Sequence, residues 1–312
     1  MKLLTYRRAR GGASVGALLE DVVVDLPLLA SRIRPGEVFP SAMLGLIGEW
    51  ARLRPLLEEL LARAPELRGE GEGRGGFFPE EEVVFFPPVP HPPKNVICLG
   101  LNYRDHVEEG LRAGSLSPQM AKVDHPIYFT KAHTSLLGHR GGIIHHPTTR
   151  TLDYEGELAL VIGRRGRDIP PEGVYEHIFG YTNANDISAR DRQRMHKQLF
   201  KGKSMDTHCP MGPYLVPKEY FGDPMDVMLR TWVNGELRQE TNTSAMIHDI
   251  AAQVSVLSLG MTLEPGDIIL TGTPSGVGYA RETPTFLQPG DVVEVEVEGL
   301  GRLRNTVVAP EG

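Results

Sequence analysis

The pattern of apolar and polar residues divides the chain into short predicted strands and a few helices. In residues 41–64, SAMLGLIGEWARLRPLLEELLARA, apolar side chains recur every three or four positions, which predicts an amphipathic helix. Elsewhere short apolar runs are bounded by Gly, Pro and Asn, as strands usually are; NVICLGLNY (95–103) and GDIILTGTP (266–274) are two of them. Many strands with few helices predict a mostly β, α+β fold whose core is either a barrel or two curled sheets.

A proline-rich segment marks the expected boundary between two domains. FFPPVPHPPKN, residues 85–95, contains five prolines, which remove amide donors and stiffen the chain. We therefore expect a small N-terminal α+β domain over residues 1–84, a linker over 85–94 and a larger domain over 95–312.

Composition and charge argue against several classes of function. The formal net charge of −7 and the pI near 5.9, without a basic stripe, disfavour nucleic-acid binding. No apolar run approaches the roughly 18 residues that a membrane-spanning helix needs, and the start MKLLTYRRARGG lacks the apolar region of a signal peptide. The two cysteines, Cys98 and Cys209, lie in unlike contexts, which indicates neither a disulfide framework nor a cysteine-based metal site. These features together predict a cytoplasmic protein.

Two glutamates at the start of an apolar run are the first candidates for chemistry. Glu155 and Glu157 stand two residues apart in LDYEGELALVIG, residues 152–163, so on a strand they point to the same face. An E-x-E pair alone is more often a solvent-facing edge. Here the same face continues with Ala159 and Val161, and two carboxylates beside apolar residues are costly unless a cation lies between them.

A third acid follows the next predicted strand. Asp186, in GYTNANDISARD, is either the N-cap of the following helix or free for another role. Ser188 and Asp191 fit an S-x-x-D capping box, which favours the second interpretation. With Glu155 and Glu157, Asp186 would complete an all-oxygen site, which selects Mg²⁺, Mn²⁺ or Ca²⁺ over zinc and leaves open positions for water and a chelating substrate.

The segment GLNYRDHVEEG, residues 100–110, offers a candidate general base. On a helix, His106 and Glu109 are three residues apart and share a face, so the carboxylate would orient the imidazole and raise its basicity toward water. The alternative is an exposed helix that carries a chance His and Glu. Glu108, the other acid nearby, would point away from His106.

Two further segments carry groups suited to an anionic ligand. In KGKSMDTHCPMGP, the glycine and turn residues around Lys203 indicate a cationic contact, although an exposed lysine is usually only solvated. LTGTPSGVG leaves a strand for a glycine-rich loop that is suited to presenting backbone amides and Thr273 to a carboxylate. The loop lacks the Gly-Lys-Ser/Thr ending of a phosphate-binding P-loop, which disfavours nucleotide binding.

Six blocks, in this order, resemble the fumarylacetoacetate hydrolase family: ICLGLNYRDHVEE, LDYEGELALVIGR, GYTNANDISARDRQ, KGKSMDTHCPMGP, VNGELRQ and GDIILTGTPSGVG. They cover roughly residues 94–308, and six blocks in order are specific where one alone is weak. The resemblance implies curled mixed β-sheets that form a barrel-like roll around the site, with few short helices. It also implies a homodimer.

The resemblance assigns roles to particular residues. It implies Mg²⁺ or Mn²⁺, with Ca²⁺ as a substitute in crystals, bound by Glu155, Glu157 and Asp186. It implies a lid, residues 105–121, that carries a water-activating pair, His106 and Glu109. We count these two residues and Lys203 as the expected catalytic residues. Contacts to the substrate's carboxylate and oxyanion are implied for Arg190, Gln193, Lys203 and Thr273. Met205 and His208 stand where phenylalanines are common in the family, and His208 would add a polar contact near the pocket.

On this basis we predict an Mg²⁺- or Mn²⁺-dependent hydrolase. It would cleave a C–C bond in a small 2,4-dioxo acid, such as an acylpyruvate or fumarylpyruvate, through a metal-stabilised enolate. The alternative is a family isomerase of the 2-hydroxyhepta-2,4-diene-1,7-dioate or 5-carboxymethyl-2-hydroxymuconate type, or a 2-oxo-acid decarboxylase; a second alternative is an inactive metal- or ligand-binding protein. Degradation of aromatic compounds or sugar acids is the implied setting. The expected partners are a small 2-oxo acid and a second copy of the chain, with neither nucleic acid nor membrane.

Overall fold

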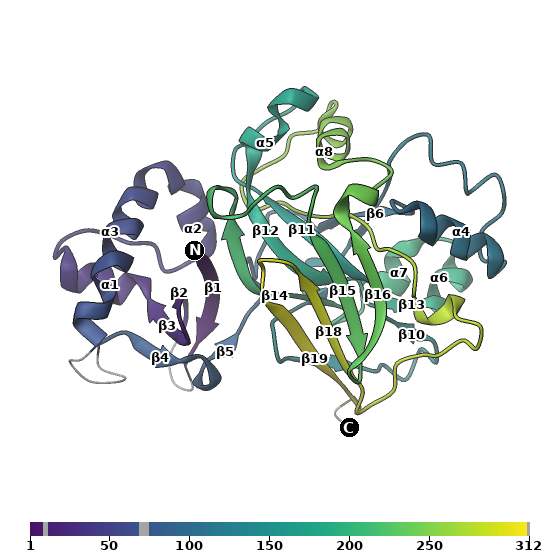
Figure 1. The fold of residues 1–312 in the computed structure, drawn as a ribbon, viewed down its shortest axis with the longest axis horizontal. Coiled ribbons are helices and arrows are strands. Elements are labelled where there is room, and N and C mark those ends of the chain that lie inside the picture. The colour runs from purple at the N-terminus through teal and green to yellow at the C-terminus, as the bar shows by residue number, and fades with distance from the viewer. Residues whose placement is uncertain (9–11, 69–74, 311–312) are drawn as a thin grey trace.

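The structure, a computed structural model, describes residues 1–8, 12–68 and 75–310. Figure 1 shows a smaller N-terminal part beside a larger part in which long strands lie in layers. In the described ranges, no helix combines the length and apolar character that crossing a membrane requires.

The N-terminal part packs helices against a small group of strands. The helix predicted over residues 41–64 is two helices that meet at Glu49, and the second buries Leu53, Leu57 and Leu60 at the expected spacing. The elements are β1 (Lys2–Arg7), β2 (Ala13–Leu19), β3 (Val22–Asp25), α1 (Leu26–Ile33), α2 (Met43–Gly48), α3 (Trp50–Arg68), β4 (Phe77–Pro79) and β5 (Val84–Phe85).

One large sheet runs through both parts of the molecule. Its other strands are β6 (Val96–Gly100), β7 (Ile127–Lys131), β8 (Leu136–Leu137), β11 (Gly156–Ile162), β12 (Ile178–Asn185), β14 (Cys209–Pro217) and β17 (Ile268–Leu270). The strand order is β4-β3-β2-β1-β14-β12-β11-β17-β6-β7, with β5 paired to β1 and β8 to β14. Because Leu3 of β1 pairs with Leu215 of β14, the N-terminal strands extend the sheet of the larger part.

Two smaller sheets complete the β structure. One is ordered β16-β15-β18-β19-β9, and the other pairs β10 with β13. Asn234 and Gly235 connect β15 to β16 with positive φ angles, as the Asn-Gly hairpin predicted from the sequence requires. The strands are β9 (Gly142–Ile144), β10 (Leu152–Asp153), β13 (Ser188–Ala189), β15 (Met228–Val233), β16 (Glu236–Asn242), β18 (Val292–Val297) and β19 (Arg302–Val308).

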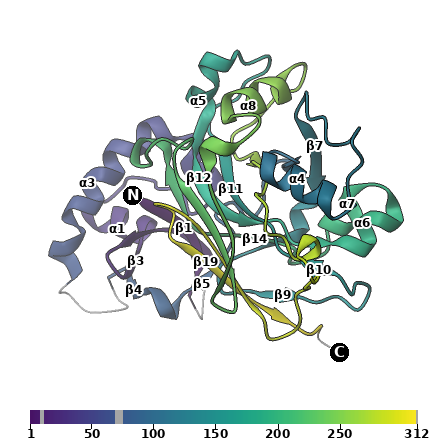
Figure 2. The same ribbon diagram turned by 45° about the vertical axis from the view of Figure 1, so that its right-hand side comes forward.

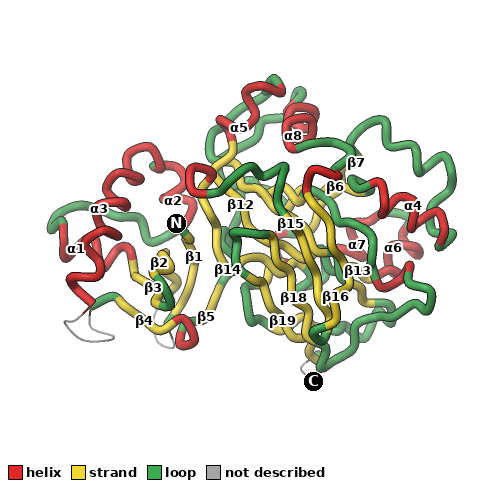
Figure 3. The backbone as a smooth tube through the Cα atoms, in the orientation of Figure 1, coloured by secondary structure: helices red, strands yellow, loops and turns green. Residues whose placement is uncertain are grey.

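Short helices lie around the edge of this β structure, as Figure 3 shows. In Figure 2 α4, α6 and α7 gather on one side, and α5 and α8 lie together at the top. The predicted mostly β, α+β class is confirmed, but no barrel closes: among the described residues the path of the large sheet ends at β4 and β7. These helices are α4 (Arg104–Arg112), α5 (Val174–His177), α6 (Arg190–His196), α7 (Leu199–Lys203) and α8 (Ile250–Ser258).

Strand β11 is buried on both faces, which makes it a rigid support. Ala159 and Val161 belong to an apolar cluster that includes side chains of the N-terminal helices. Leu158 and Leu160 belong to a second cluster, which includes side chains of α8. Alternation along the strand therefore places Glu157 on the same side as Ala159 and Val161, as the sequence predicts.

Candidate active site

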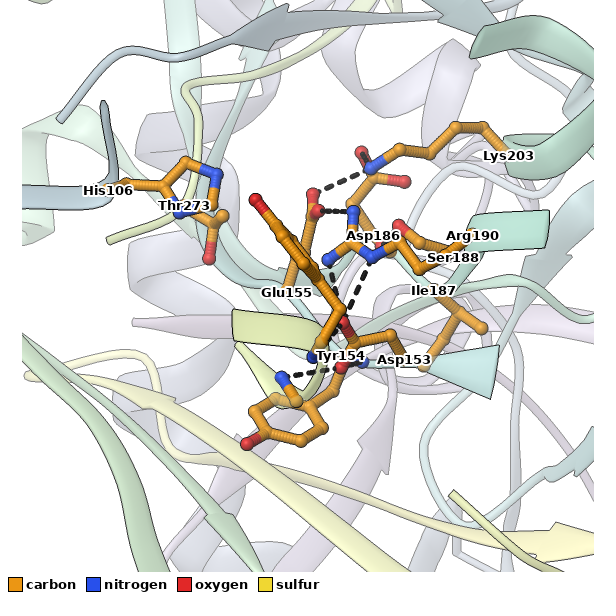
Figure 4. Close-up of polar contacts among 12 residues, drawn as sticks. His106, Asp153, Tyr154, Glu155, Asp186, Ile187, Ser188, Arg190, Lys203 and Thr273 are labelled. Atoms are coloured by element: carbon orange, nitrogen blue, oxygen red, sulfur yellow. Dashed lines mark hydrogen bonds and ion pairs between the residues drawn. The ribbon is translucent and has the colours of Figure 1, made fainter. Parts of the chain in front are cut away.

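Three buried carboxylates lie together where β11 begins and β12 ends. Glu157 belongs to β11, Glu155 stands two residues before it, and Asp186 directly follows β12, the antiparallel neighbour of β11. One ligand oxygen from each residue lies within 4.8 Å of the others. The structure thus brings the three predicted acids together, and Figure 4 shows Glu155 and Asp186 within a polar network. Oxygen atoms at this spacing suit a hard divalent cation.

The residue between the two glutamates is fixed by two side chains, Gln239 from β16 and Thr273 from the loop after β17. The amide of Gly156 donates to Gln239 Oε1 at 2.9 Å, and its carbonyl accepts from Thr273 Oγ1 at 2.9 Å. Gln239 Nε2 in turn donates to Thr273 Oγ1 at 2.9 Å. A Cβ at position 156 would lie 2.0 Å from Thr231 Oγ1, so only glycine fits. This clamp sets the spacing of the two carboxylates.

Two buried lysines neutralise part of the negative charge. Lys203 Nζ lies 2.6 Å from Glu155 Oε2 and 2.7 Å from Asp186 Oδ2. Lys131 Nζ lies 2.5 Å from Asp186 Oδ1 and donates to the carbonyl of Ile187 at 3.1 Å. In a flat sheet β7 and β12 would be roughly 19 Å apart, four spacings of about 4.8 Å, farther than a lysine side chain reaches. The sheet therefore curls around the site.

Arg190 supplies a third cation, and two of its nitrogen atoms contact carboxylates of the protein. Its Nη1 lies 2.5 Å from Glu155 Oε1, and its Nε donates to Asp153 Oδ2 at 2.9 Å. The guanidinium also lies over the ring of Tyr279, 4.5 Å from the centroid. Asp153 accepts from the backbone amides of Gly278 and Tyr279, so a turn of the chain is anchored to the same network. Figure 4 shows this path from Glu155 through Arg190 to Asp153.

The charges leave one carboxylate of the triad without a cationic partner among the described residues. Burial would raise the pKa of Glu155, but Lys203 and Arg190 overcome this effect and lower its pKa. Burial, Asp186 and Glu155 raise the pKa of Glu157 by more than Lys203 and the amide of Gly272 lower it; that amide donates to Glu157 Oε2 at 2.6 Å. A divalent cation would supply the missing charge, so the donor set fits a metal.

The predicted base lies on α4. His106 Nδ1 is 3.2 Å from Glu109 Oε2, and both side chains are buried, at 6% and 8% exposure. Glu109 Oε1 accepts from the amide of Gly276 at 2.8 Å, which fixes the carboxylate. His106 lies near Glu155. Burial raises the pKa of Glu155, whereas Lys203, Arg190 and, to a smaller extent, His106 lower it. Glu108 is exposed, as expected.

Three residues expected to contact the substrate or to lie near its pocket have protein neighbours in the structure: Gln193, His208 and Thr273. Thr273 donates its hydroxyl hydrogen to the carbonyl of Gly156, as part of the clamp. Gln193, on α6, is half-buried against Gly202 of α7, where an added Cβ would lie 2.5 Å from its Cγ. His208 is fully buried, and its Nε2 contacts the carbonyl of Ile144 at 3.1 Å. Burial lowers the pKa of His208 to about 3, so it is a neutral core residue at neutral pH.

The predicted capping box is wrong. Helix α6 begins at Arg190, and its N-cap, Ala189, has no side chain that caps it. Ser188 donates to the carbonyl of Asp186, and Asp191 accepts from Thr149 Oγ1 at 2.6 Å. Ser188 belongs to the short strand β13, one residue before the N-cap position, so Ser188 and Asp191 do not stand at the positions that a capping box requires. Asp186 nonetheless caps no helix: its carboxylate accepts from Lys131 and Lys203 instead.

Sequence reasoning missed Lys131 and Asp153, which complete the charge network. Lys131 ends the apolar run PIYFTK, and a lysine in a strand with no exposure at all marks a charge that needs a partner. Asp153 precedes the E-x-E pair by two residues, so the alternation applied to Glu155 and Glu157 extends back to it. That extended D-x-E-x-E pattern was the available signal.

Comparison with known proteins shows the same fold and sequence pattern. The family model for the fumarylacetoacetate (FAA) hydrolase C-terminal region matches residues 95–308. The oxaloacetate tautomerase YisK of Bacillus subtilis is 42% identical over 297 residues, which cover 94% of this chain and 95% of that protein.

Solved structures extend the likeness over the whole chain. A fumarylacetoacetate hydrolase from the psychrophile Exiguobacterium antarcticum is 38% identical, with a TM-score of 0.77 over 99% of this chain and 100% of that one. Maleylpyruvate hydrolase from Sphingobium sp. SYK-6, in complex with manganese(II) and pyruvate, is 27% identical, with a TM-score of 0.75 and complete coverage of both chains, 100%. The chain therefore belongs to the fumarylacetoacetate hydrolase family.

Proposed function

We propose that this protein is a metal-dependent enzyme that forms the enolate of a small 2-oxo acid, and that its reaction is keto–enol tautomerisation of an oxaloacetate-type dicarboxylic acid. The observation that carries the proposal is the imidazole of His106, oriented by Glu109 at 3.2 Å and placed near a buried carboxylate triad. The extensive identity with an oxaloacetate tautomerase supports the choice of reaction.

The triad fits Mg²⁺ or Mn²⁺ because it offers three carboxylates and contains one, Glu157, that the neighbouring cations do not neutralise. A divalent cation bound there supplies Lewis acidity, which favours negative charge on the oxygen of a 2-oxo group. Supporting this assignment, the maleylpyruvate hydrolase relative was solved with manganese(II) and pyruvate, itself a 2-oxo acid.

His106 and Glu109 supply the proton transfer. The imidazole takes a proton from C3 of the substrate, the C–H electron pair forms the C2–C3 double bond, and the π electrons of the C2 carbonyl move to its oxygen. The imidazolium then returns the proton to that oxygen, which gives the enol and restores the neutral base. Glu109 accepts from His106 and from the amide of Gly276, so the ring keeps one orientation throughout. Lys203 and Arg190 hold Glu155 in its ionised form.

Hydrolysis of an acylpyruvate is the second candidate. The same imidazole would take a proton from water, whose oxygen then attacks the distal carbonyl, and cleavage of the C–C bond leaves the enolate of pyruvate. The likeness to maleylpyruvate hydrolase favours this alternative, at the lower identity of 27%. Both reactions need the same base and the same enolate, so the site alone is compatible with either.

The test compares enol decay of oxaloacetate with cleavage of a panel of acylpyruvates, each with Mg²⁺ or Mn²⁺. Metal in buffer without protein gives the background, because free divalent cations also promote enolisation. We expect wild-type protein to accelerate tautomerisation above that background, and Glu155→Ala or excess chelator to abolish the gain. Product masses that show C–C cleavage would select hydrolysis instead. Tight Mn²⁺ binding without acceleration of either reaction would contradict both and favour a binding protein.

A further inference from the structure

Helix α4, which carries His106, is attached by two carboxylates to one short loop, residues 275–279. Asp105 Oδ2 accepts from the hydroxyl of Ser275 at 2.6 Å and lies 3.4 Å from its amide. One turn later Glu109 accepts from the amide of Gly276 at 2.8 Å. Asp105 Oδ1 also accepts from the amide of His106 at 2.8 Å, so Asp105 joins the first turn of the helix to the loop.

The rest of α4 has little apolar anchoring. Val107 is the one large apolar side chain of the helix that is buried, whereas Arg104, Glu108 and Leu111 are exposed. The segment after the helix, residues 112–124, is also largely exposed. A helix with few buried apolar contacts is held mainly by its polar contacts, and such elements open at low cost. The start of the helix is anchored by its N-cap residue Tyr103, which is fully buried, and the bonds to the loop hold the following turns, which carry His106.

The opposite side of the loop holds the charge network. Asp153 accepts from the amides of Gly278 and Tyr279, and the ring of Tyr279 lies under the Arg190 guanidinium, which contacts Glu155. The helix also contacts the short 3-10 turn that contains Tyr279. The loop of residues 275–279 therefore contacts both the helix that carries His106 and the residues that bind Glu155.

We propose that Asp105 is a positioning residue, and that its bond to Ser275 is the latch that holds His106 over the carboxylate triad. The proposal rests on the proposed function in one respect, the role of His106 as the base. Neither Asp105 nor Ser275 belongs to the triad or to the dyad, so their effect is transmitted through the position of α4. Loss of the latch leaves the triad intact and moves the base out of reach.

The test uses Ser275→Ala and Asp105→Ala, with Asp105→Asn as the conservative variant. A hydrogen bond to a charged group accounts for roughly a ten- to hundredfold effect, so we expect kcat to fall by that factor in both alanine variants. KM and Mn²⁺ affinity stay near the wild-type values, because the triad is unchanged. An asparagine side chain keeps one acceptor oxygen for the Ser275 hydroxyl but loses the second one, which accepts from the amide of His106, so Asp105→Asn should have a kcat between those of wild type and Asp105→Ala. Glu108→Ala, on the exposed face of α4, is the matched control and leaves kcat unchanged.

A second readout needs no turnover. Amide hydrogen exchange in the peptide 104–112 is measured for each full-length variant, alone and with Mn²⁺ plus pyruvate as the probe. We expect at least about tenfold faster exchange in Ser275→Ala and Asp105→Ala than in wild type. A loss of kcat without faster exchange would overturn the latch, and so would faster exchange with full kcat. If wild-type protein turned over no substrate, the proposed function would fail, whereas faster exchange in the variants would still support the latch.

Discussion

The ammonium group of Lys203 lies 2.6 Å from the carboxylate of Glu155, and both side chains are buried, with 3% and 8% of their surface exposed. A lysine with this contact shares the carboxylate with any metal that the triad holds. Burial would lower the pKa of Lys203, but Asp186 and Glu155 overcome this effect and raise it, so the lysine stays charged at neutral pH. The lysine is therefore part of the electrostatic balance of the metal-free site.

We expect Lys203→Met to destabilise the metal-free protein by about 3–5 kcal/mol, because it leaves buried carboxylates without their counter-charge. Mn²⁺ should recover part of this loss, since the cation restores positive charge and binds only the folded state. Thermal unfolding with and without Mn²⁺ measures both effects. Lys201→Met, at an exposed position on the same helix, is the control and should shift stability by less than about 0.5 kcal/mol. Equal unfolding temperatures for the two variants would contradict the prediction.

Glu157→Gln should have the opposite effect on stability. An acid whose folded pKa is raised above 4.5 makes the folded state less stable as pH rises beyond that value, and burial, Asp186 and Glu155 raise the pKa of Glu157. Removing the charge should therefore stabilise the metal-free protein by about 1–3 kcal/mol at pH 7, with a smaller gain at pH 4.

The same substitution should weaken metal binding. Removing a residue that only hydrogen-bonds to a metal ligand lowers metal affinity by roughly 10- to 100-fold. Loss of the charge of a ligand itself should lower Mn²⁺ affinity by more than that. Titration calorimetry with Mn²⁺ and chemical unfolding at the two pH values measure the two effects. A variant that is less stable than wild type at pH 7 would show that Glu157 is compensated by a contact other than a metal.

The sequence predicted the triad because its members lie on or beside two consecutive long strands, β11 and β12, which pair with each other. Glu157 lies in β11 and Asp186 follows β12, and these strands pair directly, with Gly156 opposite Asn185. Side-chain alternation and a single antiparallel pair were enough to bring three carboxylates together. The pair His106 and Glu109 was also predictable, since helical spacing alone places them on one face.

Contacts that depend on the curl of the large sheet were not predictable. Lys131 comes from β7, which β17 and β6 separate from β11, and it reaches Asp186 only because the sheet bends around the site. Local pattern also left the partners of Arg190 and Thr273 open, and in the structure both face protein groups. The resemblance to the family implied substrate contacts for these residues, so those roles stay predictions.

We expect Glu109→Gln to lower kcat by roughly 10- to 100-fold while Mn²⁺ affinity stays unchanged. The carboxylate is 3.2 Å from His106 Nδ1, and the neutral amide would support the imidazolium that forms during proton transfer less well. Steady-state kinetics with oxaloacetate and Mn²⁺ titration measure the two quantities. Glu108→Gln, one residue away and exposed, should stay within about twofold of wild type. Equal losses in both variants would show that Glu109 does not orient the base.

His208 should limit stability in acid. Burial lowers its pKa in the folded protein to about 3 from 6.5, so below pH 6.5 the unfolded chain takes up a proton that the folded protein refuses. Wild-type protein should therefore lose about 1.4 kcal/mol per pH unit relative to His208→Phe between pH 6 and pH 4. Chemical unfolding of both proteins across that range gives the difference in slope, and the lowered pKa of His139 cancels because both proteins contain it. Parallel stability curves would show that His208 is protonated in the folded protein.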